Sequence, residues 1–252
     1  MSVLPSYQFI GERSAPVLVL SHSMGANREF WDPQVEALSE KFHLLLYDHR
    51  GHGASESPPQ PWTMDDFGED LVRLLDTLDL DTVHFCGLSL GGMVGIWFAQ
   101  NAPDRLDQLI IANTTAYTKD PSILQNRLKQ IQQQGMEAIV ENILKGWFTS
   151  EFLKKNPETA ERIRRHLQGI ESANYTATGE AVCEMDLRAG LSKITSPTLV
   201  ITGSEDQPTP KVWGEEIAAE IQNAQVLELP AAHMSNIEAP AAFNQAILDF
   251  LD

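Results

Sequence analysis

One stretch of sequence decides the fold of this 252-residue chain: Thr82-Val83-His84-Phe85-Cys86-Gly87-Leu88-Ser89-Leu90-Gly91-Gly92. It runs from an apolar segment of strand length, through a Gly-x-Ser-x-Gly turn, into the helical stretch Met93 to Asn101. In a nucleophile elbow of this kind the serine takes a strained backbone conformation, and the small flanking residues let strand and helix approach each other. We therefore predict that Ser89 lies at the carboxyl edge of a sheet as a catalytic nucleophile, rather than as an idle turn residue.

Short apolar segments alternate with amphipathic segments of helical length along most of the chain. This pattern is typical of a parallel sheet covered by helices on both faces, so the predicted fold class is α/β with a mostly parallel sheet. The expected strands are Val17 to Ser21, Phe42 to Asp48, Thr82 to Cys86, Gln108 to Asn113, Thr198 to Thr202 and Gln225 to Leu229. The expected covering helices include Met64 to Leu78 and Ala239 to Leu251.

The alternation stops between residues 114 and 190, where the sequence becomes helical, more charged and rich in glutamine. It resumes at Ser196-Pro197-Thr198. We interpret residues 114–190 as a helical cap inserted into a core domain that comprises residues 1–113 and 191–252. Core and cap are expected to act as one functional unit.

The charge of the chain argues against several classes of function. Its 18 Lys and Arg residues against 35 Asp and Glu residues give a net charge of −17, which repels phosphate backbones and anionic lipid headgroups. No apolar run approaches the roughly 18 residues that span a bilayer, and the first residues lack the features of a secretion signal. We predict no nucleic-acid partner, no membrane anchor and a cytoplasmic location.

A serine hydroxyl needs a base to take its proton and a carboxylate to orient that base. In the chain order typical of this elbow both follow the nucleophile, which leaves two histidines. His233, in a loop after the last expected strand, is the predicted base, whereas His166, in a charged helical run, is predicted to be a solvated cap residue. Asp206 is the predicted acid. Glu205 is the alternative, and both carboxylates could instead only cap the helix that starts near Pro210.

The tetrahedral intermediate of acyl transfer needs two backbone N–H donors. We predict that Leu90, directly after the nucleophile, supplies one of them. Met24, in the loop after the first expected strand, is predicted to supply the other. His22 of the same loop is predicted to be structural, because it precedes the nucleophile in the chain.

No pattern in the sequence favours a metal or another cofactor. The run Asp48-His49-Arg50-Gly51-His52-Gly53-Ala54-Ser55 is dense in histidine, but its spacing matches no zinc signature and its arginine would repel a cation. It is predicted to form a buried, hydrogen-bonded turn. The two cysteines, Cys86 and Cys183, have no ligand spacing and are predicted to be buried free thiols.

The motifs resemble those of α/β-hydrolase-fold enzymes, and in particular those of the 3-oxoadipate enol-lactonases of aromatic catabolism. The resemblance runs nearly end to end and is carried by the elbow, the Ala15 to Ser21 start, the turn Tyr47 to Ser55, Trp147-Phe148-Thr149 and Pro230 to Glu238. The chain departs from that family in two places. His22 and Met24 stand where the family commonly has Asn and Leu, and Lys145-Gly146 stands where an arginine often precedes the tryptophan.

This resemblance implies a cofactor-free hydrolysis of a small-molecule substrate, the enol-lactone, to 3-oxoadipate through an acyl-enzyme on Ser89. It further implies that Ser23 and Trp147 contact the substrate. An arginine before the tryptophan would suit a substrate carboxylate. In this chain Lys145, Arg127 and Arg188 are the candidates for that contact, and the sequence leaves this choice and the oligomeric state open.

Two other functions stay open from the sequence alone. One is a general carboxylesterase, or another hydrolase of a different small substrate that uses the same triad. The other is a non-catalytic ligand-binding protein that retains the fold, against which the presence of Ser89, Asp206 and His233 argues. A haloalkane dehalogenase is disfavoured because it would need a carboxylate at position 89.

Overall fold

The computed structural model describes residues 4–252 and contains a seven-stranded sheet in the order β1-β3-β2-β4-β5-β6-β7. β1 pairs antiparallel with β3, and all other neighbouring strands are parallel. The predicted fold class, a mostly parallel α/β sheet, is thus confirmed. The strands are β1 Tyr7–Ile10, β2 Val17–Ser21, β3 His43–Tyr47, β4 Val83–Leu88, β5 Leu106–Ala112, β6 Thr198–Gly203 and β7 Ala224–Leu229.

All six expected strands are present, with ends that differ from the expected ones by at most two residues. The sequence analysis missed β1. This strand has four residues at the edge of the sheet, and none of them is buried, so it lacks the continuous apolar run that marks the central strands.

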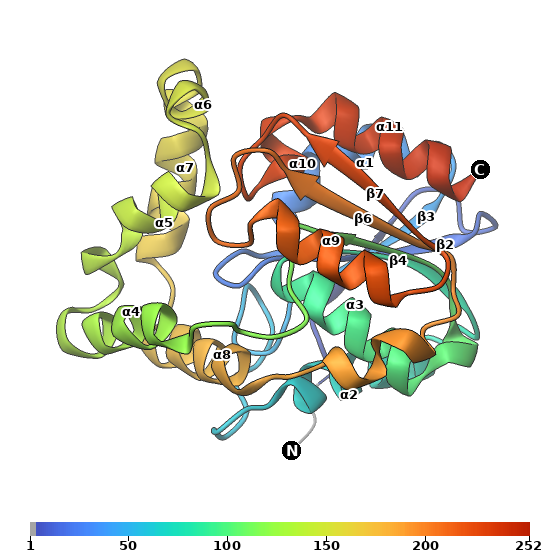
Figure 1. Ribbon diagram of the computed structural model, residues 1–252, viewed down its shortest axis with the longest axis horizontal. Helices are drawn as coiled ribbons and strands as arrows, with labels where there is room; N and C mark the ends of the chain where they lie inside the picture. Colours follow the sequence, from blue (N-terminus) through green and yellow to red (C-terminus); the bar gives the residue numbers. More distant parts are fainter. Residues whose placement is uncertain (1–3) are drawn as a thin grey trace.

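Helices cover both faces of the sheet, because successive side chains of a strand point to opposite sides. In β2, Leu18 and Leu20 belong to the buried cluster that contains side chains of α1 and α11, whereas Val19 belongs to the cluster with α2 and α3. Figure 1 shows these helices on opposite sides of the sheet. The helices of the core are α1 Asp32–Ser39, α2 Met64–Thr77, α3 Leu90–Asn101, α9 Lys211–Glu220, α10 Ser235–Glu238 and α11 Pro240–Leu251.

Five α-helices follow β5 and precede β6, and Figure 1 shows them grouped beside the sheet. The chain segments that lead to and from this group run side by side, since Tyr117 pairs with Asp186 and the Leu187 N–H donates to the Ala116 carbonyl at 2.8 Å. The division into a core and a cap of residues 114–190 stays a prediction. The helices are α4 Pro121–Gln134, α5 Val140–Trp147, α6 Ser150–Lys155, α7 Pro157–Gln168 and α8 Ser172–Glu184.

None of the helices within residues 4–252 is long and apolar enough to cross a bilayer.

Candidate active site

The turn at Ser89 joins β4 to α3 in a left-handed backbone conformation, with φ 56° and ψ −112°. The glycines on either side make this turn possible. A Cβ on Gly87 would lie 2.1 Å from the carbonyl oxygen of Gly91, and a Cβ on Gly91 would lie 2.0 Å from the carbonyl oxygen of Ser21. Strand and helix can therefore meet this closely only without side chains at these positions.

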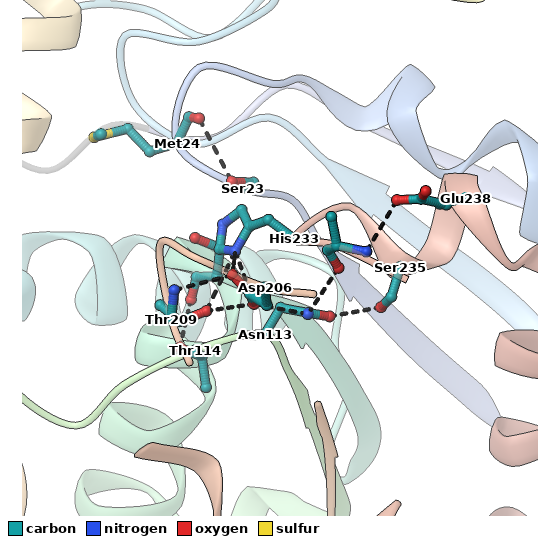
Figure 2. Close-up of polar contacts among 11 residues, drawn as sticks. Ser23, Met24, Asn113, Thr114, Asp206, Thr209, His233, Ser235 and Glu238 are labelled. Atoms are coloured by element: carbon teal, nitrogen blue, oxygen red, sulfur yellow. Dashed lines mark hydrogen bonds and ion pairs between the residues drawn. The ribbon is translucent and has the colours of Figure 1, made fainter. Parts of the chain in front are cut away.

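His233 lies in the loop between β7 and α10, with its Nδ1 atom 3.1 Å from both carboxylate oxygens of Asp206 (Figure 2). Both side chains are buried, whereas the neighbouring Glu205 is exposed. The structure therefore brings the predicted base and acid together and leaves the alternative acid in solvent. Asp206 also accepts a hydrogen bond from the Thr209 N–H at 3.0 Å, so it supports the turn before α9 as well.

The Asp206 carboxylate stays ionised in this position. Burial raises its pKa, but the attraction to His233 and the hydrogen bonds from His233, Thr209 and Asn113 outweigh burial and lower the pKa below its ordinary value. An ionised carboxylate at Nδ1 fixes the tautomer in which Nε2 is free to accept a proton.

Sequence reasoning missed the residues that hold this pair in place. Asn113, with φ 47°, directly follows β5 and donates to Asp206 at 2.8 Å, while its own carbonyl oxygen accepts a 2.5 Å hydrogen bond from Ser235. Figure 2 shows this chain of contacts. A polar residue directly after a buried strand was the available signal, because an asparagine tolerates the left-handed conformation and can reach across a strand end.

Glu238 links the histidine loop to the segment between α5 and α6. Its carboxylate accepts hydrogen bonds from the Ala232 N–H at 2.9 Å and from the backbone N–H and hydroxyl of Thr149, which follows α5. The Met234 N–H donates to the Trp147 carbonyl at 2.9 Å. The position of His233 therefore depends on the packing of α5 against the core.

The backbone N–H groups of Met24 and Leu90, predicted as oxyanion donors, make no hydrogen bond within residues 4–252. Their two segments are tied together, because the Gly91 N–H donates to the His22 carbonyl at 3.1 Å. Unpaired N–H groups on two fixed segments beside a nucleophile are what an oxyanion hole requires.

Three buried histidines, His22, His49 and His52, brace the loop that carries Met24. The His22 ring accepts the His49 N–H at 3.1 Å and donates to the Ser23 carbonyl at 2.8 Å, and the His52 ring accepts the Gly25 N–H at 3.1 Å. Burial lowers the pKa of all three, to about 3 for His49 and about 4 for His52, and repulsion by neighbouring histidines, including His166, lowers it further. They are neutral structural groups at neutral pH.

Arg50 of the same turn is buried and paired with Asp70 at 2.8 Å and Asp66 at 2.9 Å. Within residues 4–252, no group of three His, Cys, Asp or Glu side chains is arranged to hold a metal ion. The run 48–55 therefore forms a hydrogen-bonded turn, which is buried at residues 48–50 and 52 as predicted but exposed at Gly53 and Ala54. Cofactor independence stays a prediction.

A cavity of about 320 Å³ is lined by residues of α3, α4, α5, α8 and α9 and of the loops around them. We call it the catalytic cavity. Ser89 and His233 line it, and so do Met24 and the two predicted substrate contacts, Ser23 and Trp147. The structure thus gathers the predicted nucleophile, base and substrate contacts around one cavity.

Of the three cations considered for a substrate carboxylate, only Arg127 of α4 lines the catalytic cavity. Lys145 is exposed on α5, and Arg188 lines a different hollow and pairs with Asp186 at 2.5 Å. Within residues 4–252, Arg127 forms no ion pair. Arg127 also interacts with the side chain of Tyr175. Burial raises the pKa of Tyr175, and the charge of Arg127 and its hydrogen bond lower that pKa in part.

Two expectations from the sequence were wrong. His166 is not a solvated residue, because α7 turns it toward the core, where its ring lies 5.0 Å from that of Phe30 and burial lowers its pKa. Cys86 is buried as expected, but Cys183 is only half-buried, since it lies near the end of α8.

Comparisons of sequence and structure relate the chain to hydrolases. A family model described as alpha/beta hydrolase fold matches residues 16–240. The chain is 36% identical to 3-oxoadipate enol-lactonase 2 of Acinetobacter baylyi, over 96% of this chain and 91% of that protein. A crystal structure of the enol-lactonase from Burkholderia xenovorans LB400 matches with a TM-score of 0.96 and 37% identity, over 99% of this chain and 96% of that chain.

A RutD protein of Caulobacter sp. strain K31, named for carbamate hydrolysis, is also similar, with 33% identity over 93% of this chain and 90% of that protein. The resemblance read from the motifs is confirmed, while the substrate is not decided by these relatives.

The buried histidines predict that the protein loses stability in mild acid. Their pKa values lie below the ordinary value of about 6.5, so the unfolded chain binds protons that the folded chain does not. The contribution of these histidines to the free energy of unfolding is therefore fully present above pH 6.5. It falls as the pH drops toward 4, by up to about 1.4 kcal/mol per pH unit for each histidine. Urea unfolding at pH 7.5, 6 and 5 measures this slope.

A matched pair of variants tests the assignment to these histidines. His52→Gln is expected to reduce the slope by about one proton, whereas His43→Gln, at a half-buried position on β3 outside the cluster, leaves it unchanged. A flat stability between pH 7.5 and 5 would contradict the assignment.

Asp206→Asn is expected to fold normally and to lose on the order of 10⁴-fold in kcat, because an amide no longer fixes the catalytic tautomer of His233. Hydrolysis of p-nitrophenyl acetate measures the loss, with circular dichroism as the folding control. Glu205→Gln, at the exposed neighbouring position, should retain full activity. Near-wild-type turnover of Asp206→Asn would place the catalytic acid elsewhere.

Proposed function

Because this chain belongs to the alpha/beta hydrolase family, we propose that it is a serine hydrolase that opens a small lactone, 3-oxoadipate enol-lactone. One observation carries the proposal: Ser89 and His233 line the same cavity, and buried Asp206 holds His233. The near-full-length similarity to two enol-lactonases of Acinetobacter baylyi supports this choice of lactone.

In the proposed first step the Ser89 hydroxyl attacks the lactone carbonyl carbon while Nε2 of His233 takes the hydroxyl proton. Asp206, at 3.1 Å from Nδ1, stabilises the imidazolium that forms. The carbonyl oxygen becomes an oxyanion and accepts hydrogen bonds from the N–H groups of Met24 and Leu90. Since these donors are fixed before the reaction, they favour the tetrahedral state over the planar ester.

Collapse of the tetrahedral state breaks the ring carbon–oxygen bond and leaves an acyl group on Ser89. The enol oxygen takes the proton from His233. A water molecule then attacks the acyl carbonyl with His233 as base, which restores the serine hydroxyl and releases the free acid. The enol tautomerises to the ketone, so that one lactone and one water give one molecule of 3-oxoadipate.

The enol-lactone carries a carboxylate, and Arg127 is the group that we propose to bind it. Arg127 lines the catalytic cavity and has no carboxylate partner within residues 4–252, so its guanidinium can pair with the substrate. Gly146 lines the same cavity at the position where the resembling family often has arginine. A cation on α4 would thus replace one on α5.

A carbamate hydrolase is the second candidate, because a RutD protein is 33% identical over nearly the whole chain. Ser89 would attack a carbamate carbonyl with the same help from His233 and Asp206, so the triad does not separate the two functions. The substrates differ in charge, since a simple carbamate ester carries no carboxylate for Arg127 to bind.

The deciding experiment compares three substrates with purified protein. The loss of ultraviolet absorbance of the enol-lactone is followed beside the hydrolysis of p-nitrophenyl acetate and of a small carbamate, with Ser89→Ala as control. We expect Ser89-dependent lactone opening with kcat/KM above roughly 10⁴ M⁻¹s⁻¹. Turnover of the acetate alone would indicate a general esterase. Faster cleavage of the carbamate than of the lactone would favour the carbamate hydrolase. No turnover of any substrate by the folded protein would indicate a ligand-binding role.

Arg127→Ala is expected to raise KM for the enol-lactone by about 10- to 100-fold, which corresponds to one charge-assisted hydrogen bond. The kcat/KM for neutral p-nitrophenyl acetate should not change, and Arg127→Lys should restore part of the lactone binding. Lys145→Ala, which removes an exposed cation outside the cavity, is the matched control. An equal loss on both substrates would show that Arg127 has a structural role instead.

A further inference from the structure

A second hollow, of about 700 Å³, adjoins the catalytic cavity. We call it the outer groove. Thr115 and Trp213 line both spaces, whereas Tyr117, Ala189 and Ile217 line only the outer groove. Thr115 and Trp213 therefore form the partition between the catalytic cavity and the outer groove, which has about twice its volume.

Trp213 lies in the first turn of α9, and its indole is held by a contact with Lys119. The Lys119 ammonium lies 5.4 Å from the centre of the indole ring and 5.9 Å from that of Tyr117, and Glu216 fixes this ammonium with an ion pair of 2.7 Å. The Thr115 hydroxyl donates to the Tyr117 carbonyl at 2.8 Å. Both halves of the partition are thus fixed by contacts of their own.

The chemistry of the outer groove suits an uncharged chain. Ala116, Leu191 and Ile217 give it an apolar surface. Its one lining cation, Arg188, is paired with Asp186 at 2.5 Å and lies 3.8 Å from the centre of the Tyr117 ring. With its cation already paired, and with the exposed carboxylates of Glu216 and Glu220 beside it, the groove offers nothing to a second anionic group.

We propose that Trp213 is the residue that limits substrate length, and that the outer groove is an acyl-chain subsite that this indole closes off. With the indole in place, the space beside Ser89 is about 320 Å³ and is separated from the outer groove. Removal of the indole joins the two spaces, and a linear apolar chain can then extend over Ile217. The inference rests on the proposed serine hydrolase activity but is independent of the identity of the lactone.

A series of p-nitrophenyl esters from acetate to octanoate tests the proposal. The wild-type protein should favour acetate and butyrate, and Trp213→Ala should raise the octanoate-to-acetate ratio of kcat/KM by at least about 10-fold, since each additional buried methylene is worth roughly 4-fold. Trp213→Phe should give an intermediate ratio. Val212→Ala, at the exposed neighbouring position outside both spaces, should leave the ratio unchanged.

A double variant tests whether the chain lies in the outer groove. Ala189→Asp places a carboxylate in the outer groove, at a residue that does not line the catalytic cavity. In the Trp213→Ala background this second change should abolish the gain on octanoate and leave acetate hydrolysis unchanged. A ratio that Trp213→Ala leaves within about 2-fold of wild type, with acetate activity intact, would overturn the inference alone. Absence of Ser89-dependent acetate hydrolysis in the folded wild-type protein would overturn the proposed function and the inference with it.

Discussion

The left-handed turn at Ser89 is the constraint on which the rest of the site depends. A non-glycine residue in this conformation costs of order 1–3 kcal/mol, and the cost is offset by hydrogen bonds of the Ser89 N–H to the Ala112 carbonyl and of the Thr114 hydroxyl to the Ser89 carbonyl. Because Gly91 has no side chain, α3 begins against the end of β2, and its N–H reaches the His22 carbonyl. One close approach thus positions the nucleophile and both N–H groups that we assign to the oxyanion.

The other half of the site depends on buried polar contacts rather than on backbone strain. Asp206 and His233 follow different strands, and their alignment requires Asn113 and Ser235 to bridge the strand ends. Glu238 extends these contacts to Thr149 at the end of α5. If one of these partners were lost, a buried carboxylate would be left without compensation. This half of the site therefore depends on the packing of α5, whereas the turn at Ser89 does not.

The sequence predicted the parts of the fold that depend on local pattern. The elbow follows from glycine spacing, and the central strands follow from apolar runs, because both express steric and burial requirements of neighbouring residues. The edge strand β1 was missed because its half-exposed residues obey no such requirement. Asn113 and Glu238 were missed for another reason: their roles arise from contacts between segments up to about a hundred residues apart. The orientation of His166 likewise depends on how α7 packs against Phe30.

The two residues that we propose to select the substrate lie outside the turn at Ser89. Arg127 reaches the catalytic cavity from α4 and Trp213 reaches it from α9. A change of charge at one position and a change of volume at the other would therefore alter which substrates bind without disturbing the nucleophile. Because α9 begins five residues after Asp206, however, the partition at Trp213 is anchored to the same turn that carries the acid. With the roles that we propose, length selection is coupled to Asp206 through Thr209, whereas charge selection is coupled to it through the packing of the helices between β5 and β6.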